Sequence, residues 1–216
     1  MLCQVDSHCR PQKCFQPVLK AHEPIVSANM WRSTNPQDQR AITDFVRYMA
    51  TTLSQERSFV FFHFDGDATW SNRKKSQTFK QFQELIVTKV KRLMGARAIP
   101  ERIERLFRIV PFYSIEAWLY QNTEVAIQIC SRVHRNKHVG KFKRWAQSRH
   151  ELDEVKHVKR ETCLGSNHNQ ELAETSFPAK TVYEIGKSFA ESVRTLQASD
   201  ALKTALKETR RPSKHV

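Results

Sequence analysis

A run of seven residues, Ser58-Phe59-Val60-Phe61-Phe62-His63-Phe64, is rich in strand-forming side chains and ends abruptly at Asp65-Gly66-Asp67. Aromatic and β-branched residues fit a pleated, packed backbone. A nearly continuous apolar run of this length is typical of a central strand that is buried on both faces. The run therefore predicts a strand inside a sheet, and such a sheet needs helices to cover it.

The flanking segments supply the helices and a second strand. Asn35 followed by Pro36 predicts a helix start. A second helix is expected from about Ser76, and residues 106–112 form a second candidate strand. Strand, helix and strand in this order predict a right-handed crossover and a parallel pair, so the fold class is α/β with a central, mainly parallel sheet. The apolar stripe expected on the first helix consists of Ile42, Phe45, Val46, Met49 and Leu53.

The chain of 216 residues is interpreted as three parts: an irregular N-terminal segment over residues 1–24, one α/β domain over residues 25–209, and a basic tail over residues 210–216. The first part carries three prolines and little periodicity, which predicts a loop with at most one short strand. From about residue 120 the domain is expected to be helical and basic. Helices are expected at residues 169–175, at 188–196 and after Ser199.

The net charge indicates the class of partner. Thirty-six Lys and Arg against 22 Asp and Glu give a formal charge of +14, which attracts polyanions. We therefore expect nucleic acid, DNA or RNA, as the partner; the alternative is that the charge serves only solubility or adhesion to anionic surfaces. The densest basic stretch runs from Arg132 to Arg160. The residues expected to contact backbone phosphates are Lys141, Lys143, Arg144, Arg149 and Lys187.

Cysteine usage and hydropathy favour a reducing, cytoplasmic location. The five cysteines are an odd number, and no charged, apolar and small-residue signal sequence precedes them. The longest apolar run, near Phe59 to Phe64, is far shorter than the ~20 residues that cross a bilayer, so no membrane span is expected. Cys3, Cys9 and Cys14 lack the spacing of a zinc knuckle. His134 and His138 have the spacing of a helical zinc pair, but without an intervening Glu they are interpreted as solvated basic residues.

Three carboxylates are the candidate active site. Asp65 and Asp67 follow the buried strand, and Glu116 follows the second strand at the start of a helix. Because parallel sheets place sites at the carboxyl ends of their strands, we expect the three to converge there. Close carboxylates repel unless a cation intervenes, and Mg²⁺ or Mn²⁺ is the usual cation where phosphate is the substrate. The alternatives are a surface turn at Asp65-Gly66-Asp67 and a helix-dipole role for Glu116.

The pattern of an Asp-x-Asp after a buried strand and Glu116-Ala117-Trp118 after a later strand resembles Toprim-like proteins. The likeness is closest to those allied to the overcoming-lysogeny-type nucleases that accompany ATPases in bacterial phage defence. It implies a Rossmann-like sheet, Mg²⁺-dependent hydrolysis of nucleic acid with Asp65, Asp67 and Glu116 as metal ligands or catalytic residues, and a partner ATPase. In that family a glutamate at the end of the first strand completes the metal site. This chain departs from the pattern there, because the candidate that it offers upstream, Glu23, lies in a Pro-flanked segment with no following Gly.

Two alternatives remain open. The segment Asp65 to Thr69 is also similar to the first motif of haloacid-dehalogenase-type phosphatases, which would make Asp65 a nucleophile and Asp67 an acid/base. The other alternative is a non-catalytic protein of the same fold that binds nucleic acid or docks on a partner.

Overall fold

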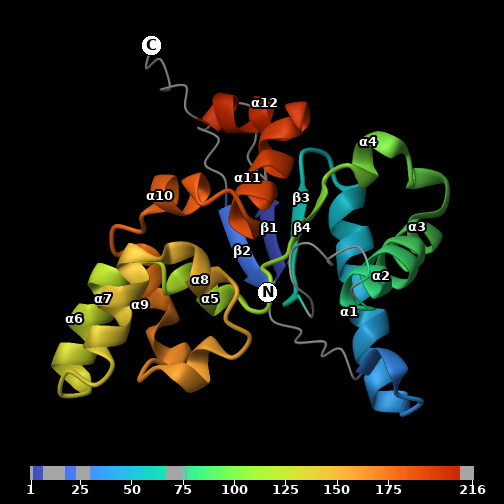
Figure 1. The fold of residues 1–216 in the computed structure, drawn as a ribbon. Helices are drawn as coiled ribbons and strands as arrows, with labels where there is room; N and C mark the ends of the chain where they lie inside the picture. The colour runs from blue at the N-terminus through green and yellow to red at the C-terminus, as the bar shows by residue number, and fades with distance from the viewer. Residues whose placement is uncertain (1, 7–17, 23–29, 67–74, 76, 210–216) are drawn as a thin grey trace. The chain divides into compact units, whose positions relative to one another are not determined.

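The computed structural model describes residues 2–6, 18–22, 30–66, 75 and 77–209 (Figure 1). Contacts between Cα atoms divide the chain into two compact units. The sheet unit comprises Met1–His63, Lys80–Ile109 and Arg194–Val216, and the helical unit comprises Phe64–Phe79 and Val110–Val193. The single domain expected over residues 25–209 stays a prediction.

The sheet unit contains a four-stranded sheet in the order β2-β1-β3-β4. Its strands are β1 (Leu2–Asp6), β2 (Val18–His22), β3 (Phe59–His63) and β4 (Leu106–Ile109). β3 and β4 pair in parallel, as expected, with Val60 opposite Leu106 and His63 opposite Ile109. β1 pairs antiparallel with both β2 and β3, so β2 runs in the same direction as β3 and β4. The protein is thus of mixed helix and strand.

Two expectations for this part of the chain are wrong. The segment over residues 1–24 was expected to be irregular, but it contributes both β1 and β2. The sheet was expected to be mainly parallel, but two of the three pairings among the described strands are antiparallel. Both errors have one cause: the pairing of β1 with β3 joins residues more than fifty positions apart, and no local signal reports such a pairing.

The helix α1 (Pro36–Ser54) begins and packs as its sequence predicts. Its N-cap Asn35 accepts a hydrogen bond from the Gln37 N–H at 2.9 Å through its side-chain oxygen, and Pro36 occupies the first turn. The five residues of the predicted apolar stripe are all buried.

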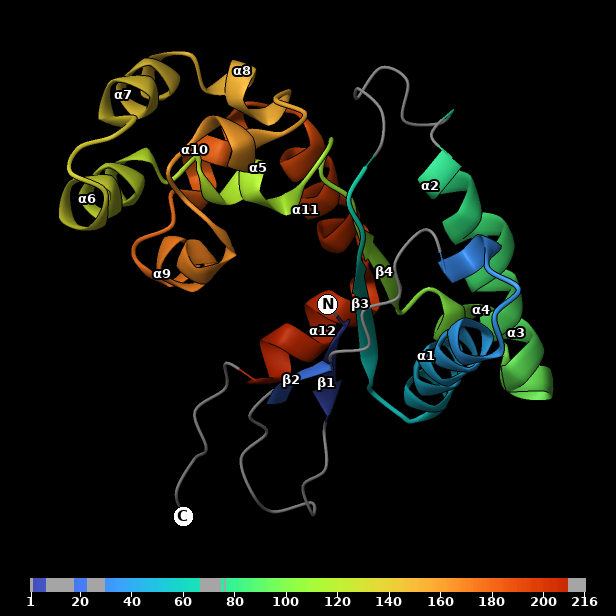
Figure 2. The ribbon, with the colours of Figure 1, turned by 90° about the horizontal axis from the view of Figure 1, so that it is seen from below.

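Successive residues of β3 point to opposite faces of the sheet, and each face has its own helices (Figure 2). On one face Phe62 packs edge-on against Phe45 of α1 and stacks on Phe82, with ring centroids 5.3 and 5.4 Å away. On the other face Phe59 and Phe107 form a core with Leu202 of α12 (Asp200–Thr209). The sheet is therefore covered on both sides, as the apolar character of β3 requires.

The helix expected from Ser76 is a succession of short segments. They are α2 (Gln77–Gln81), a π-helical segment (Phe82–Val87), α3 (Thr88–Met94), a 3-10 turn (Gly95–Arg97) and α4 (Pro100–Ile103). Another 3-10 turn, Met30–Arg32, precedes α1. α3 lies beside α1, as Figures 1 and 2 both show.

The helical unit is built from short helices around one core. They are α5 (Ile115–Leu119), α6 (Thr123–Val133), α7 (Val139–Gln147), α8 (Arg149–Asp153), α9 (Asn169–Glu174), α10 (Ala179–Glu184) and the first part of α11 (Ser188–Ala198), with 3-10 turns at Val158–Glu161 and Ser166–His168. The core includes Tyr120, Ile129, Phe142, Leu152 and Leu172, all fully buried. The helices expected at residues 169–175, 188–196 and after Ser199 are confirmed.

Ser199 also caps α12 as expected, because its hydroxyl accepts the Leu202 N–H at 3.2 Å. The basic tail over residues 210–216 lies outside the described residues. Among the helices that are described, none is long and apolar enough to cross a membrane.

Candidate functional site

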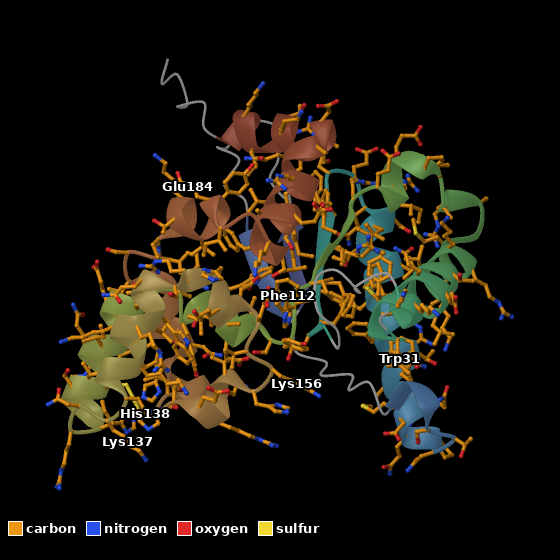
Figure 3. All side chains as sticks on the ribbon, in the orientation of Figure 1. Trp31, Phe112, Lys137, His138, Lys156 and Glu184 are labelled. Carbon is orange, nitrogen blue, oxygen red and sulfur yellow. A yellow bond between two sulfur atoms is a disulfide. The ribbon has the colours of Figure 1, made fainter. Side chains whose placement is uncertain are left out.

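A pocket of about 420 Å³ in the helical unit contains two of the three candidate carboxylates, Asp65 and Glu116. Its wall is completed by four side chains that can carry positive charge, on a segment far away in sequence: Lys156, His157, Lys159 and Arg160. Figure 3 labels Lys156, which lines the pocket, and Phe112, which directly precedes the lining residue Tyr113 in the sequence. The pocket thus combines carboxylates with a basic wall, an arrangement suited to a phosphate group and its cation.

Asp65 and Gly66 hold the start of α5 in place. Asp65 Oδ1 accepts the backbone N–H of Ile115, the first residue of α5, at 3.1 Å. Gly66 lies so close to the next segment that a Cβ would come within 1.9 Å of the Phe112 carbonyl oxygen and 2.5 Å of the Pro111 carbonyl oxygen. Only glycine fits such an approach. The segments that follow β3 and β4 in the chain are therefore in contact, whereas the convergence of all three candidate carboxylates stays a prediction.

Glu116 is a buried acid with a long-range partner. Its side chain is 6% exposed, and its Oε1 lies 2.7 Å from the Lys159 ammonium, whose side chain is 47% exposed. The same Oε1 accepts a hydrogen bond from the Asn169 amide nitrogen at 3.2 Å. An acid in such surroundings needs a compensating cation. In this structure Lys159 supplies the charge.

A buried chain of hydrogen bonds anchors α5 next to Glu116. The indole N–H of Trp118 donates to the Ser188 hydroxyl at 2.8 Å, and that hydroxyl lies 3.3 Å from Asp153 Oδ2. Asp153 is itself buried, and this burial raises its pKa from 3.8 to about 6, although Lys187 and the hydrogen bonds from Ser188 oppose the shift. Trp118 thereby fixes the orientation of the helix that carries Glu116.

The third candidate carboxylate, Asp67, lies outside the described residues, and so does Glu23. Glu23 directly follows His22, the last residue of β2, in the sequence. Within the described ranges, no group of three or more His, Cys, Asp or Glu side chains is placed to hold a metal ion.

The five cations expected to contact phosphates divide into two kinds. Three have partners within the protein: Lys141 forms an ion pair with Glu161 at 2.6 Å, Arg149 donates to the Gln121 carbonyl oxygen, and Lys187 pairs with Glu154. Burial also lowers the pKa of Arg149. Lys143 and Arg144 are exposed on α7 and form no ion pair with any described residue. These two are the cations of the set that are free to meet a polyanion.

The basic wall of the pocket was not singled out from the sequence. Lys156 to Arg160 belong to the basic stretch that was noted, but charge density alone does not tell which cations face an acid. The distance in sequence between Glu116 and Lys159 hides their pairing, because neither helical nor strand periodicity relates residues so far apart.

Comparisons with known proteins give no relative: no family model matches the chain, and neither does any curated protein or solved structure.

Proposed function

We propose that the pocket formed by Asp65, Glu116 and the basic segment Lys156 to Arg160 binds a phosphodiester of nucleic acid and hydrolyses it with the help of Mg²⁺ or Mn²⁺. The observation that carries the proposal is the meeting of two carboxylates and four basic side chains in one pocket. The Toprim-like pattern of the sequence supports the same reaction, and so does the net charge of +14.

The residues fit a hard cation in the kind of atom that they offer. Mg²⁺ prefers carboxylate oxygens, and it binds through one or two protein carboxylates together with phosphate oxygens of the substrate. Glu116 is already neutralised by a cation, the Lys159 ammonium. Asp65 and Glu116 would hold the metal together with Asp67. The bound metal would polarise the phosphate and activate a water molecule.

The chain's own side chains would do the rest. With Glu116 serving as a metal ligand, Lys159 would be free of its ion pair and could bind a phosphate oxygen. Lys156 and Arg160 are exposed and form no ion pair with the residues described, so their charges are available to orient the backbone of the substrate. Trp118 and its hydrogen-bonded chain would keep Glu116 in position.

The direct test is a nicking assay on supercoiled plasmid with the full chain. We expect open-circular or linear product in the presence of Mg²⁺ or Mn²⁺ and none with EDTA, because two carboxylates facing a phosphate repel it without a cation. Calorimetry in the same buffer should detect binding of the divalent ion. A chain that binds no divalent ion and cleaves neither DNA nor RNA would refute the hydrolase proposal.

The second candidate function is a non-catalytic nucleic-acid-binding protein, and the exposed Lys143 and Arg144 on α7 favour it as much as they favour a nuclease. We expect the Lys143→Glu/Arg144→Glu double variant to weaken binding of a fluorescent oligonucleotide roughly tenfold or more at low salt. Affinity of the unaltered chain should fall steeply as salt is raised.

The matched control is Lys180→Glu on α10. The Lys180 side chain is 92% exposed and reaches Glu184 only at 3.9 Å, so the fold does not depend on it. Because the control reverses one charge and the double variant two, a loss of binding free energy in the control about half that of the double variant would show that total charge, and not a surface on α7, governs binding. Plasmid cleavage that is kept in the control and reduced in the double variant would show that the α7 surface contributes to the reaction.

A further inference from the structure

Cys130 and Cys163 meet in the core of the helical unit. They form a disulfide, with Cα atoms 6.6 Å apart, that joins the end of α6 to the segment after the 3-10 turn Val158–Glu161. Cys130 is fully buried, and Cys163 packs against the same core. Two thiols are therefore held together by the fold across 33 positions of the sequence.

A third candidate zinc ligand, the imidazole of His134, lies four residues after Cys130. His134 is the C-cap residue that ends α6. Its Nε2 is buried and has no hydrogen-bond partner among the described residues. A buried ring nitrogen without a partner costs free energy unless something binds it.

The chain after α6 is bent around these donors. The N–H groups of His134 and Asn136 both donate to the Cys130 carbonyl oxygen, at 3.1 and 3.0 Å, and Arg135 and Asn136 have positive φ. The turn brings the Lys137 carbonyl oxygen to 3.2 Å from Cys163 Sγ. Lys137 and His138, labelled in Figure 3, lie in this turn.

A second imidazole lies against the first. The rings of His134 and His168 are 5.5 Å apart, edge to face, and His168 is buried. Its Nδ1 accepts the Gly165 N–H at 3.1 Å, so binding of a metal through Nε2 would require the other tautomer and the loss of that bond. Cys130, Cys163 and His134 are therefore the three candidate ligands, and His168 is the imidazole that lies against His134.

We propose that the reduced chain binds one zinc ion between Cys130, Cys163 and His134, at a site separate from the carboxylate pocket. Two thiolates and an imidazole are the ligands that select Zn²⁺, and they do not suit the Mg²⁺ of the proposed reaction. The zinc ion would cross-link two segments of the helical unit and so stabilise it. The helices of this unit between residues 139 and 184 have nine residues or fewer, so the unit should gain stability from a cross-link.

The disulfide and the zinc site are alternative states of the same two sulfur atoms. In this structure the two sulfurs are bonded to each other, and in the described ranges no group of three or more His, Cys, Asp or Glu side chains is placed to hold a metal ion. A dithiol reductant would transfer two electrons and two protons to the disulfide and become a disulfide itself. Zn²⁺ would then displace the two thiol protons, and His134 would bind as the neutral imidazole. In a reducing compartment the zinc form is the one expected.

The test is the metal content of the full chain, purified under a dithiol reductant without chelators and measured by mass spectrometry. We expect about one zinc ion per chain, because the three ligands belong to a single site. Cobalt substitution should give thiolate-to-cobalt charge-transfer bands and the visible bands of a tetrahedral ion. The variants Cys163→Ser and His134→Gln should lower zinc affinity roughly tenfold or more.

Matched controls separate this site from other thiols and imidazoles. The Cys3→Ser/Cys9→Ser/Cys14→Ser variant and His138→Gln should keep their zinc. Because a ligand variant can simply fail to fold, the unaltered chain is also stripped with a zinc chelator under reductant; its melting temperature should fall and recover with equimolar zinc.

A reduced, folded chain that takes up no zinc or cobalt would overturn the proposal and leave the pair as a disulfide only. Zinc that is lost in the N-terminal triple variant would overturn it as well. Neither outcome depends on plasmid cleavage, so failure here and failure of the proposed hydrolase activity are distinguishable.

Discussion

Glu116→Gln is expected to reduce Mg²⁺-dependent cleavage by about two to four orders of magnitude, the range typical of a lost acid or base, while nucleic-acid binding is kept. Glutamine has the same shape and keeps an oxygen that can accept from Asn169. It lacks the charge that the proposal requires for the metal. Lys159 is half-exposed, so its ammonium can return to water and the fold should tolerate the change. The measurement is the initial rate of plasmid nicking, with oligonucleotide binding in parallel.

Glu151→Gln is the matched control for Glu116→Gln. Glu151 is an exposed acid on α8, in the same unit, and it does not line the pocket. Its variant should cleave at the unaltered rate. Asp65→Asn is a useful companion, because asparagine can still accept the Ile115 N–H and so spares the start of α5. If Glu116→Gln cleaves as fast as the unaltered chain, Glu116 is only the ion-pair partner of Lys159.

Asp153→Asn is expected to stabilise the protein at pH 7.5, by up to about 3 kcal/mol at roughly 1.4 kcal/mol per pKa unit. Burial raises the pKa of Asp153 from 3.8 to about 6. Between these two values the folded state keeps a proton that the unfolded state has lost. The free energy of unfolding therefore falls as pH rises from 4 to 6, and above pH 6 the whole penalty of the buried charge is present. Asparagine carries no charge, and its oxygen can still accept from Ser188.

The measurement is urea unfolding of both proteins at pH 7.5 and at pH 4. Most of the advantage of Asp153→Asn should be gone at pH 4, because Asp153 is then protonated in the folded state and about half protonated in the unfolded state, so little of the penalty for the buried charge remains. Asp44→Asn is the control: this side chain is 58% exposed and pairs only with Arg47 on the same helix, so a change below about 0.5 kcal/mol is expected at either pH. A loss of stability in Asp153→Asn at pH 7.5 would mean that the buried carboxylate makes a favourable interaction as an anion.

The parts of the fold that the sequence predicted are those with local signals. Asn35 and Pro36 mark a helix start, and the apolar stripe of α1 has helical spacing, so the helix follows from neighbouring residues alone. β3 is recognisable from its composition, and its parallel pairing with β4 follows from the helical segment between them. β1 and β2 are five residues each, with prolines between them, and their place in the sheet depends on a distant partner.

The candidate site likewise has one part that follows from local sequence signals and another part that does not. Asp65 and the start of α5 each follow one of the two parallel strands, so the sequence places them at the same edge of the sheet. The hydrogen bond from the Ile115 N–H to Asp65 is consistent with this placement. That Glu116 pairs with Lys159 could not be predicted, because a 3-10 turn in a stretch without periodicity carries the lysine. Lys141, Arg149 and Lys187 were selected for their charge alone, and charge does not reveal that each has a partner within the protein.

The way in which the chain alternates between the two units has a consequence for biosynthesis. The sheet unit takes residues from the beginning, the middle and the last part of the chain, and the helical unit interrupts it twice. Leu202 of α12, which covers Phe59 and Phe107, leaves the ribosome more than ninety residues after β4. Until then one face of the sheet stays uncovered, so the nascent chain cannot complete this unit during most of translation. Neither unit can be produced as one continuous fragment, and a chain that stops at α11 would expose an aromatic surface to aggregation.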